Sequence, residues 1–414
     1  MKIHRGWWVA GVTFLTLLAA AAFRSTTSPF LLPLETEFHW SRSLTSAALS
    51  LNLLVYGLTA PFAATLMQRF GVRRVVVFAL GLVSLGSGLT IWMNQAWQLY
   101  LYWGVMVGFG TGCLALVFAS MVANRWFHKH RSLITGVFSA AYATGQLIFL
   151  PFITSLTDTV GWRSGALVVS AFAVAIAPIF WIVYREHPRD VKVFPVGATE
   201  HIKEDAKPAL TVRDNFRVLF GAAKKVPFWI LAGTFFVCGW STNGLIGAHF
   251  IPAAHDHGMP VTLAAGLLAV VGIFDFIGTI ASGWLTDRVN PIILLMFYYG
   301  LRGLALLSVP FVLGPNVELP LMFFVVFYGL DWIATVPPTV ELCRKYFGLT
   351  NSPIVYGWVF ASHMIGAAIA AWFAGAIRDS QGDYYVAWIT AAALCIAATI
   401  SLTTLFKREP RVAL

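Results

Sequence analysis

Ionisable side chains inside long apolar segments are the residues of this chain most able to do chemistry. An unpaired charge in an apolar environment is costly, so each such residue predicts a partner, a ligand or a role in proton transfer. One lies in the first half of the chain and four lie in the second: Arg24, Asp275, Arg302, Asp331 and His363.

Arg24 has two interpretations. It begins a polar run that ends at Ser28, and no acid lies in the other apolar segments of the first half, which favours contact with an anion or a role in gating. The structural alternative is that the side chain extends outward to water, or binds carbonyls that Pro29 leaves without a backbone donor.

The charges of the second half predict a buried network. Arg302 neutralises Asp275 or Asp331 within its own half, and breaking such a pair costs about 3–5 kcal/mol. Proton coupling through either acid is the alternative, because buried carboxylates also serve as proton relays. Asp331 is the better candidate for coupling, since Pro337 and Pro338 break the apolar segment soon after it.

The elements that carry these residues are long apolar segments. The chain of 414 residues is 58% hydrophobic and 11% charged, whereas a soluble protein carries about 25% charged residues. Helices of about 20 apolar residues span about 30 Å of hydrocarbon, and such runs are too long for barrel strands. We therefore predict an all-α integral membrane protein with twelve transmembrane helices: 7–34, 43–67, 75–93, 97–123, 132–155, 164–184, 227–251, 261–285, 291–313, 319–342, 353–377 and 384–406.

The basic residues lie mainly on one side of these predicted helices. Of the 28 Lys and Arg residues, 23 fall at the chain ends or in loops on the same side. By the positive-inside rule, both termini are cytoplasmic and the expected location is the cytoplasmic (inner) membrane. Topology thus accounts for the net charge of +10, and we expect a monomer that contacts the lipid bilayer and no nucleic acid.

Neither the cysteines nor the histidines predict a metal or cofactor site. The four cysteines are scattered without metal-ligand spacing, and the chain has no phosphate-binding loop or nucleophile–base pair. We predict no cofactor, no metal and no enzymatic activity. The one metal-like cluster falls in an outer loop, and its His-x-His spacing directs the side chains apart: His249, His255, Asp256 and His257.

A polar stretch at 185–226 divides the predicted helices six and six. We predict an N-terminal six-helix bundle over 1–184, a cytoplasmic linker over 185–226 and a C-terminal bundle over 227–414. The linker part from Thr211 to Phe220 predicts a short amphipathic helix on the cytoplasmic face.

The two halves are related in sequence. At a shift of 221 residues Gly136 matches Gly357, and Asp158 matches Asp379. Because each half has an even number of helices, the halves form a parallel repeat about an axis along the membrane normal.

The loops after the second and eighth helices carry a recognisable motif. The pattern G-x-L-x-D-R-x-G-R-R of the major facilitator superfamily stands at 64–74 with Gln68 in place of the acid, and in part at 283–288. The chain resembles this superfamily over essentially its whole length. The resemblance implies that the loops form cytoplasmic charge contacts that hold the outward-facing state, with Asp287 carrying more of them because Gln68 is not acidic. The residues in this gating role are Arg69, Gly71, Arg73, Gly283, Asp287 and Arg288.

Within the superfamily, several stretches are similar to the oxalate/formate antiporter and monocarboxylate transporter branch: GWWVAGVTFL, EFHWSRSLTSAALSLNLLVYGLTAPFA, ANRWFHKHRSLITG and AGAIRDSQGDYYVAW. In that branch, Phe-Asp in the eighth helix is followed four residues later by an arginine that binds the carboxylate. Here Phe274-Asp275 is followed by Thr279. Either the cation has moved to another helix, or the substrate is not a simple carboxylate.

Two residues are candidates to replace that arginine. The resemblance places the first, seventh and eleventh helices around the cavity, so Arg24 faces the polar patch from Ser241 to Asn243. His363 in the eleventh helix titrates near neutral pH, although a hydrogen-bonded interior histidine is the alternative. The further substrate-binding candidates are Tyr142, Asn243, Asn52 and Trp332. A helix–helix hydrogen bond is the alternative for Asn52, and aromatic packing against lipid or core is the alternative for Tyr142 and Trp332.

These observations together predict a secondary active transporter. It moves a small organic anion, a monocarboxylate or a related acid, by alternating access, with proton symport or anion exchange. The alternative is a facilitator-type exporter of a neutral or cationic small molecule. A membrane enzyme or receptor without transport has no motif to support it.

Overall fold

The computed structural model describes residues 4–128, 131–198 and 211–408. Several side chains within 116–148, those of Tyr142 and Gln146 among them, lie outside the described residues, as do those of 349, 350 and 408. The described residues are almost entirely helical, with one isolated β-bridge between Phe127 and Val196.

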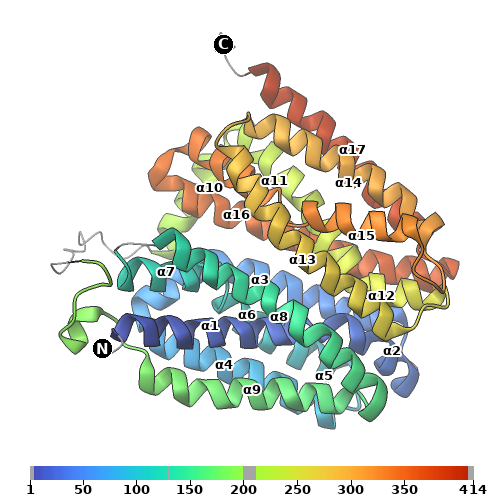
Figure 1. Ribbon diagram of the computed structural model, residues 1–414, viewed down its shortest axis with the longest axis horizontal. Coiled ribbons are helices and arrows are strands. Elements are labelled where there is room, and N and C mark those ends of the chain that lie inside the picture. The colour runs from blue at the N-terminus through green and yellow to red at the C-terminus, as the bar shows by residue number, and fades with distance from the viewer. Residues whose placement is uncertain (1–3, 129–130, 199–210, 409–414) are drawn as a thin grey trace.

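Helices in the first half of the chain lie together in the lower part of Figure 1. They are α1 (Arg5–Arg24), α2 (Thr27–Phe38), α3 (Arg42–Phe70), α4 (Val72–Leu89), η1 (Thr90–Trp92), α5 (Ala96–Leu99), the π-helix η2 (Tyr100–Val107), α6 (Gly108–Cys113), α7 (Leu116–Trp126), α8 (Arg131–Val160), α9 (Trp162–Val183) and η3 (Pro188–Val191).

Helices in the second half form the upper group in the same view. A kink at Gly348, where φ is +78°, divides the longest of them. They are α10 (Val212–Ala223), α11 (Val226–Gly239), the π-helix η4 (Trp240–Ile246), α12 (Gly247–Asp256), α13 (Val261–Thr286), α14 (Pro291–Val312), α15 (Leu319–Asp331), α16 (Val336–Gln381) and α17 (Tyr385–Arg408).

Ten helices among the described residues are long and apolar enough to cross a bilayer. The predicted spans at 97–123 and 132–155 are not among these ten, so the predicted number of twelve is not confirmed. A continuous helix over 97–123 is wrong: the chain leaves helical geometry at Leu114 and Ala115, between α6 and α7. The preceding GFGTGC sequence weakens the helix there, because glycine is a poor helix former.

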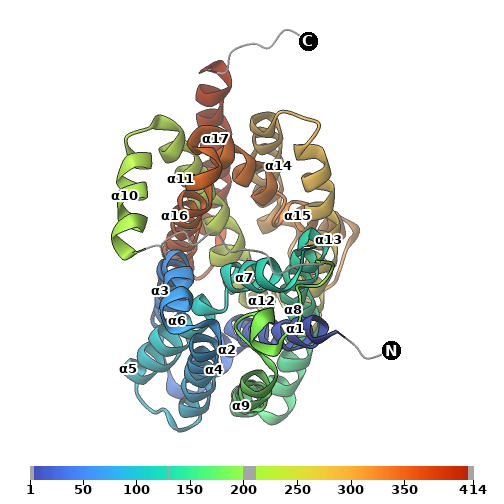
Figure 2. The same cartoon turned by 90° about the vertical axis from the view of Figure 1, so that its left-hand side faces the viewer.

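Buried apolar side chains form two large clusters. One joins residues from Val9 to Tyr184, and the other joins mainly residues from Ala222 to Leu405. The end-on view of Figure 2 shows the corresponding lower and upper groups of helices. The groups meet where α3 packs along α16 and α8 packs along α13.

Glycine permits the closest of these contacts. A Cβ atom added at Gly57 of α3 would lie 2.2 Å from the Cβ of Met364 of α16. A larger residue at this position would push the two helix groups apart.

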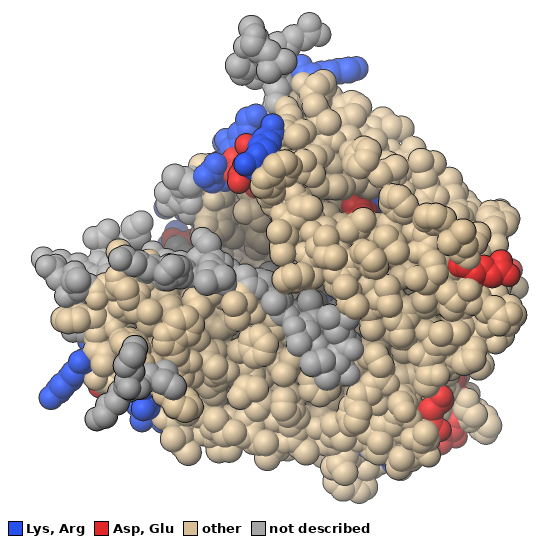
Figure 3. Space-filling view, in the orientation of Figure 1, with Lys and Arg blue, Asp and Glu red and all other residues tan. Residues whose placement is uncertain are grey.

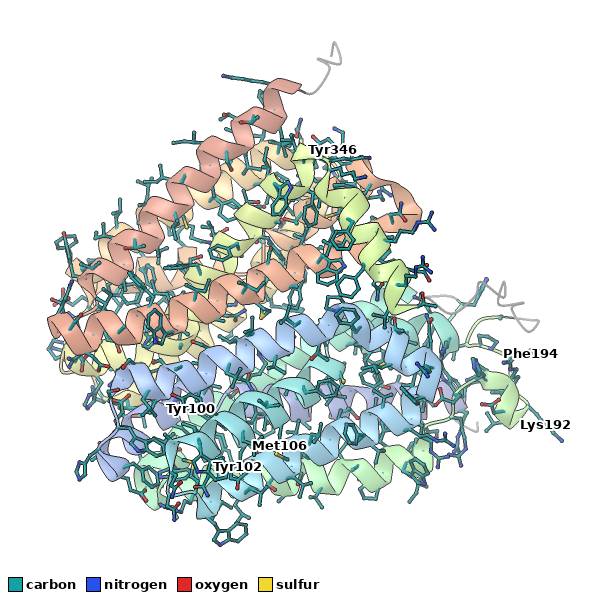
Figure 4. The ribbon with its side chains drawn as sticks, turned by 180° about the vertical axis from the view of Figure 1, so that it is seen from behind. Tyr100, Tyr102, Met106, Lys192, Phe194 and Tyr346 are labelled. Atoms are coloured by element: carbon teal, nitrogen blue, oxygen red, sulfur yellow. The ribbon has the colours of Figure 1, made fainter. Side chains whose placement is uncertain are left out.

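Charged side chains are sparse on the outer surface around the middle of the molecule. On the face shown in Figure 3, Lys and Arg gather mainly at the left and upper ends with a few acids among them, other Asp and Glu lie at the right edge, and most of the surface between the two ends is uncharged. Figure 4 shows Lys192 and Phe194 at the basic end, on the segment that follows α9. An uncharged band of this kind is typical of a membrane-spanning protein.

The linker helix α10 contacts both groups of helices. Thr211 caps it, because the Thr211 hydroxyl accepts a hydrogen bond from the Asp214 N–H (3.2 Å) and the Asp214 carboxylate accepts one from the Thr211 N–H (2.9 Å). The Thr211 hydrogen bonds lower the pKa of the Asp214 carboxyl below its ordinary value. Asn215 donates to the Pro61 carbonyl of α3 (3.2 Å), and Phe216 packs against Trp358 of α16 (ring centroids 5.5 Å apart).

Candidate substrate site

A break in the first membrane span positions Arg24. Helix α1 ends at Arg24 and α2 begins at Thr27, near Pro29, which has no backbone donor. The Thr26 hydroxyl donates to the Phe23 carbonyl (2.7 Å), and the Thr27 hydroxyl donates to the Arg24 carbonyl (2.9 Å). Arg24 thus lies in the last turn of a helix, where the helix dipole favours a cation.

Arg24 lines two adjoining pockets between the halves. Its guanidinium carbon lies 4.6 Å from the ring centroid of Tyr56, a cation–π contact. The first pocket is lined by Arg24, Ser25, Thr27, Ser28, Leu150, Gly247, Leu268, Val271, Gly272, Asp275 and Trp332. The second is lined by Arg24, Thr27, Leu49, Asn52, Leu53, Asn243, Gly247 and Trp332. Because the pockets share Arg24, Thr27, Gly247 and Trp332, we treat them as one cavity.

Two amides from opposite halves line this cavity beside π-helices. Asn52 of α3 donates to the Trp103 carbonyl in η2 (2.6 Å), so it makes a helix–helix hydrogen bond as well as lining the cavity. Asn243 belongs to η4, where the Tyr328 hydroxyl donates to the Ser241 carbonyl (2.8 Å). Figure 4 shows side chains of η2, with Tyr100, Tyr102 and Met106 labelled. π-Helices occur frequently at functional sites.

His363 lies apart from the cavity. Its ring packs between Phe235 (4.8 Å between centroids) and Phe360 (5.8 Å), and it lines neither pocket. Within the described part of the chain, its Nδ1 has no hydrogen-bond partner. The side chain of Tyr142, another predicted substrate-binding residue, lies outside the described residues. The structure therefore brings together Arg24, Asn52, Asn243 and Trp332, but not His363.

In the core of the second half, Arg302 donates hydrogen bonds to the end of the neighbouring helix α15 and to the turn that follows it. Its Nε donates to Asp331 Oδ2 at 2.6 Å, which is one of the two ion pairs predicted from the sequence. Its Nη2 donates to the carbonyls of Asp331 and Trp332, the latter at 3.2 Å. Asp275 makes different contacts, because its Oδ1 accepts from the Thr279 hydroxyl (3.0 Å) and the Ile333 N–H (2.9 Å).

The two halves also meet at the ends of their helices, around Asp379 of α16. Asp379 accepts from the Arg42 N–H (3.0 Å) and the Ser43 N–H (2.7 Å), so it caps α3 across the interface. The Arg42 side chain pairs with Glu35 and donates to the Tyr384 hydroxyl. We call Glu35, Arg42, Ser43, Asp379 and Tyr384 the outer contact cluster, after the side on which the predicted topology places it.

Asp379→Ala is expected to loosen the outer contact cluster. Loss of an exposed carboxylate at a helix N-terminus costs about 0.3–1 kcal/mol, which is about a 2- to 5-fold change in the population of the closed outer side. Ser46 lies buried beside Gly375. A Ser46→Cys reporter is therefore expected to react faster with a membrane-impermeant maleimide in the Asp379→Ala variant than in the chain that keeps Asp379. Asp158→Ala, the exposed repeat mate, is the control. An unchanged labelling rate for Asp379→Ala would contradict a closing role.

The histidine-rich segment was predicted as an outer loop, which is wrong for most of it, because His249, His255 and Asp256 lie in α12. Its members are used separately. His249 is buried, with Nε2 2.7 Å from the Ala371 carbonyl oxygen and Nδ1 3.3 Å from the Tyr384 hydroxyl. Asp256 pairs with Arg378 at 2.6 Å. Among the described residues, no group of three or more potential ligands could hold a metal ion.

A family model described as the Major Facilitator Superfamily matches residues 13–347. The chain belongs to the Major Facilitator Superfamily. The resemblance inferred from the loop motif is confirmed, and the chain is a multi-pass membrane transporter of this superfamily.

Relatives of this superfamily protein include monocarboxylate transporters. It is 25% identical over 400 residues to the uncharacterized MFS-type transporter YcxA of Bacillus subtilis, covering 94% of this chain and 91% of that protein. It is 26% identical over 366 residues to monocarboxylate transporter 13 of Bos taurus, covering 86% and 79% respectively. A bacterial homolog of the human lysosomal transporter Spinster, solved in an inward-facing and unoccupied conformation, superposes with a TM-score of 0.72 at 16% identity over 100% of both chains. At this identity the likeness to the solved structure shows the fold alone.

The superfamily loop motif of the first half is completed by an acid that sequence reasoning missed. Glu186 accepts hydrogen bonds from the N–H groups of Val72 (3.1 Å) and Arg73 (2.8 Å) at the start of α4, and from Arg125 Nη1 (3.1 Å). Gly71, with φ of +86°, makes the turn that exposes these N–H groups. Glu186 thus supplies the negative charge that the motif lacks at Gln68. The available signal was an acid in the basic sequence YREHPR, directly after a predicted span.

The other predicted gating residues lie at the same loops. The Arg73 guanidinium lies 4.0 Å from the Trp181 ring centroid, and that of Arg69 lies 5.4 Å from the Phe70 ring centroid. Arg288 stacks over Trp284 at 4.2 Å. Gly283 lies in the last turn of α13, and the exposed Asp287 follows at its C-cap, where its gating role stays a prediction.

Glu186→Ala is expected to destabilise the first half. It removes a helix-capping carboxylate and the partner of Arg125, which together contribute about 1–3 kcal/mol. The expected result is a lower melting temperature in detergent, with partial recovery in Glu186→Gln. Glu341→Ala is the control, because the exposed Glu341–Arg344 pair contributes about 0–1 kcal/mol. Equal melting temperatures for Glu186→Ala and Glu341→Ala would refute the capping role.

Proposed function

We propose that this protein is a secondary active transporter of a small organic anion, a monocarboxylate or a related acid. The observation that carries the proposal is Arg24, which lines both pockets of the cavity. A guanidinium offers several donors in a fixed fork that matches a carboxylate. Asn52 and Asn243 add amides from opposite halves, so an anion bound to Arg24 would contact both halves.

Alternating access of two halves is the proposed mechanism. Residues 1–184 and 227–414 would move as the two bundles, joined by the linker 185–226. The outer contact cluster, together with the hydrogen bond from the Ser28 hydroxyl to the Ala248 carbonyl (2.9 Å), supports an inward-facing state. We propose a monomer in the cytoplasmic membrane with both termini in the cytoplasm.

Movement of the anion would be coupled to proton symport or to anion exchange. The ion pair between Arg302 and Asp331 supports the structural interpretation of Asp331, because each charge neutralises the other. Uptake into proteoliposomes that depended neither on a pH gradient nor on an internal anion would exclude both modes of coupling.

Export of a neutral or cationic compound is the second candidate. The observation that favours it is Asp275, a carboxyl group in the wall of the first pocket, beside Trp332. A cation would be attracted by that carboxylate and by the indole face of Trp332.

Thermal-shift measurements separate the two candidates. The purified protein is tested against lactate, pyruvate, oxalate and formate, and against neutral and cationic compounds of similar size. Stabilisation by a carboxylate that disappears in Arg24→Ala is the result expected from the anion proposal. Stabilisation by cations alone, unaffected by Arg24→Ala, would favour the second candidate.

A further inference from the structure

The cavity wall at Trp332 belongs to a turn that separates two helices inside a membrane span. In the Leu319–Gly348 span, α15 ends at Asp331 and α16 begins at Val336, and residues 332–335 form turns. Pro337 and Pro338 have no N–H, so they cannot bond the carbonyls four residues earlier. Irregular backbone at membrane depth is tolerated only where protein groups or a cavity satisfy it.

One face of α13 supplies groups that satisfy this turn. Asp275 Oδ1 accepts the Ile333 N–H at 2.9 Å. The Ser282 hydroxyl donates to the Ala334 carbonyl, the group that Pro338 leaves without a helical donor (2.5 Å). Asp275 and Ser282 are seven residues apart, so both lie on the same face of the helix.

Close packing brings that face of α13 to the turn. A Cβ atom at Gly278 would lie 1.9 Å from the Leu330 carbonyl oxygen, and one at Gly329 would lie 2.7 Å from the Phe274 Cβ. The two helices therefore meet at backbone distance directly before the turn, and the side chains of Asp275 and Ser282 are long enough to reach it.

Thr279 orients the carboxyl group. Its hydroxyl donates to the same Asp275 oxygen that accepts the Ile333 N–H (3.0 Å). Arg302 holds the turn from the other side, through the Trp332 carbonyl at 3.2 Å. Groups from two helices, α13 and α14, thus hold the turn. Its residue Trp332 lines the cavity.

We propose that Asp275, Thr279 and Ser282 are positioning residues that hold the 332–335 turn and keep Trp332 in the wall of the substrate cavity. Asp275 acts as a hydrogen-bond acceptor and not as a proton carrier. The inference rests on the proposed function only in that the cavity holds the transported anion.

The acceptor role predicts how substitutions rank. Asp275→Asn keeps an oxygen that accepts from Ile333 and Thr279, whereas Asp275→Ala keeps none. Thr279→Val keeps the shape of the side chain and removes the hydroxyl that orients the acceptor. We therefore expect Asp275→Asn to disturb the turn least, Thr279→Val to have an intermediate effect and Asp275→Ala to disturb it most.

The first experiment needs no substrate. In proteoliposomes, a Trp332→Cys reporter is labelled with a membrane-impermeant maleimide. The chain without the reporter gives the background labelling, which should be low because its four cysteines are buried. Adding Asp275→Asn is expected to leave the labelling rate within about 2-fold, whereas adding Asp275→Ala raises it about 10-fold or more. Labelling of Asp275→Asn as fast as that of Asp275→Ala would overturn the inference, because charge and not an acceptor would then hold the turn.

The second experiment measures L-lactate uptake with Trp332 in place. Asp275→Ala is expected to raise the KM about 10-fold, and Asp275→Asn, which keeps the acceptor, is expected to raise the KM by less and to keep its pH profile. When Trp332 is already replaced by Ala, adding Asp275→Ala should raise the KM little further, because Asp275 affects the KM through the Trp332 side chain. Full additivity, or a pH profile changed by Asp275→Asn, would overturn the inference. A wild-type protein that moves no organic acid would refute the proposed function, while the labelling result would still decide the inference.

Discussion

Arg24→Ala is expected to raise the KM for a transported carboxylate about 10- to 100-fold, because hydrogen bonds to a charged group contribute about 1.5–3 kcal/mol. The guanidinium lies in the cavity wall, at the C-terminal end of α1. Initial rates of L-lactate uptake into proteoliposomes, measured over a range of concentrations, give the KM.

Two further variants make this result specific. Arg24→Lys keeps the charge and loses the fork of donors, so we expect a KM between those of the wild type and Arg24→Ala. Arg344→Ala removes an exposed cation outside the cavity and is expected to leave the KM unchanged. Equal effects of Arg24→Ala and Arg344→Ala would show that Arg24 does not contact the anion.

Arg302→Met is expected to cause the largest loss of stability. It leaves the Asp331 carboxylate buried without its cation, at a cost of about 3–5 kcal/mol. It also removes the donor to the Trp332 carbonyl. The measurement is the melting temperature in detergent, which should fall well below that of the wild type.

The double variant Arg302→Met/Asp331→Leu tests the cause. Removing both charges together should recover most of the stability, because no unpaired charge then remains buried. Recovery should be incomplete, since the Trp332 carbonyl still lacks its donor. A double variant as unstable as the sum of the two single variants would contradict the ion-pair account.

Residues that are costly in lipid were identifiable from the sequence. Arg24 and Arg302 stand out in apolar segments, and the expense of a buried charge is enough to predict a ligand or a partner for each. Few acids lie in the spans, so the sequence leaves two candidate partners for Arg302, Asp275 and Asp331. The choice between them depended on how α14 and α15 pack, which no local pattern encodes.

Contacts made through backbone groups were not identifiable in this way. Glu186, Asp379 and Asp275 each accept from backbone N–H groups that lie between 58 and 337 residues away along the chain. Their partners are main-chain atoms, so no complementary residue type marks the pairing. The break at Leu114 and Ala115 was missed because apolar composition reports burial in lipid and not the continuity of a helix.

For His363, the sequence predicts a site that the structure does not place at the cavity. A histidine in a cavity-lining span predicts a site, yet the ring lies between Phe235 and Phe360 and lines neither pocket. Which face of a helix turns toward the cavity depends on packing against its neighbours. Its substrate-binding role stays a prediction, and Arg24 is the stronger candidate.

The most direct test of anion transport is flux itself. Proteoliposomes containing the wild-type protein are given radiolabelled lactate, pyruvate, oxalate or formate, with Arg24→Ala as the matched control. The account predicts uptake of at least one acid that responds to a pH gradient or to an internal anion and is lost in Arg24→Ala. Uptake of a neutral or cationic compound, with no acid moved and no effect of Arg24→Ala, would contradict it.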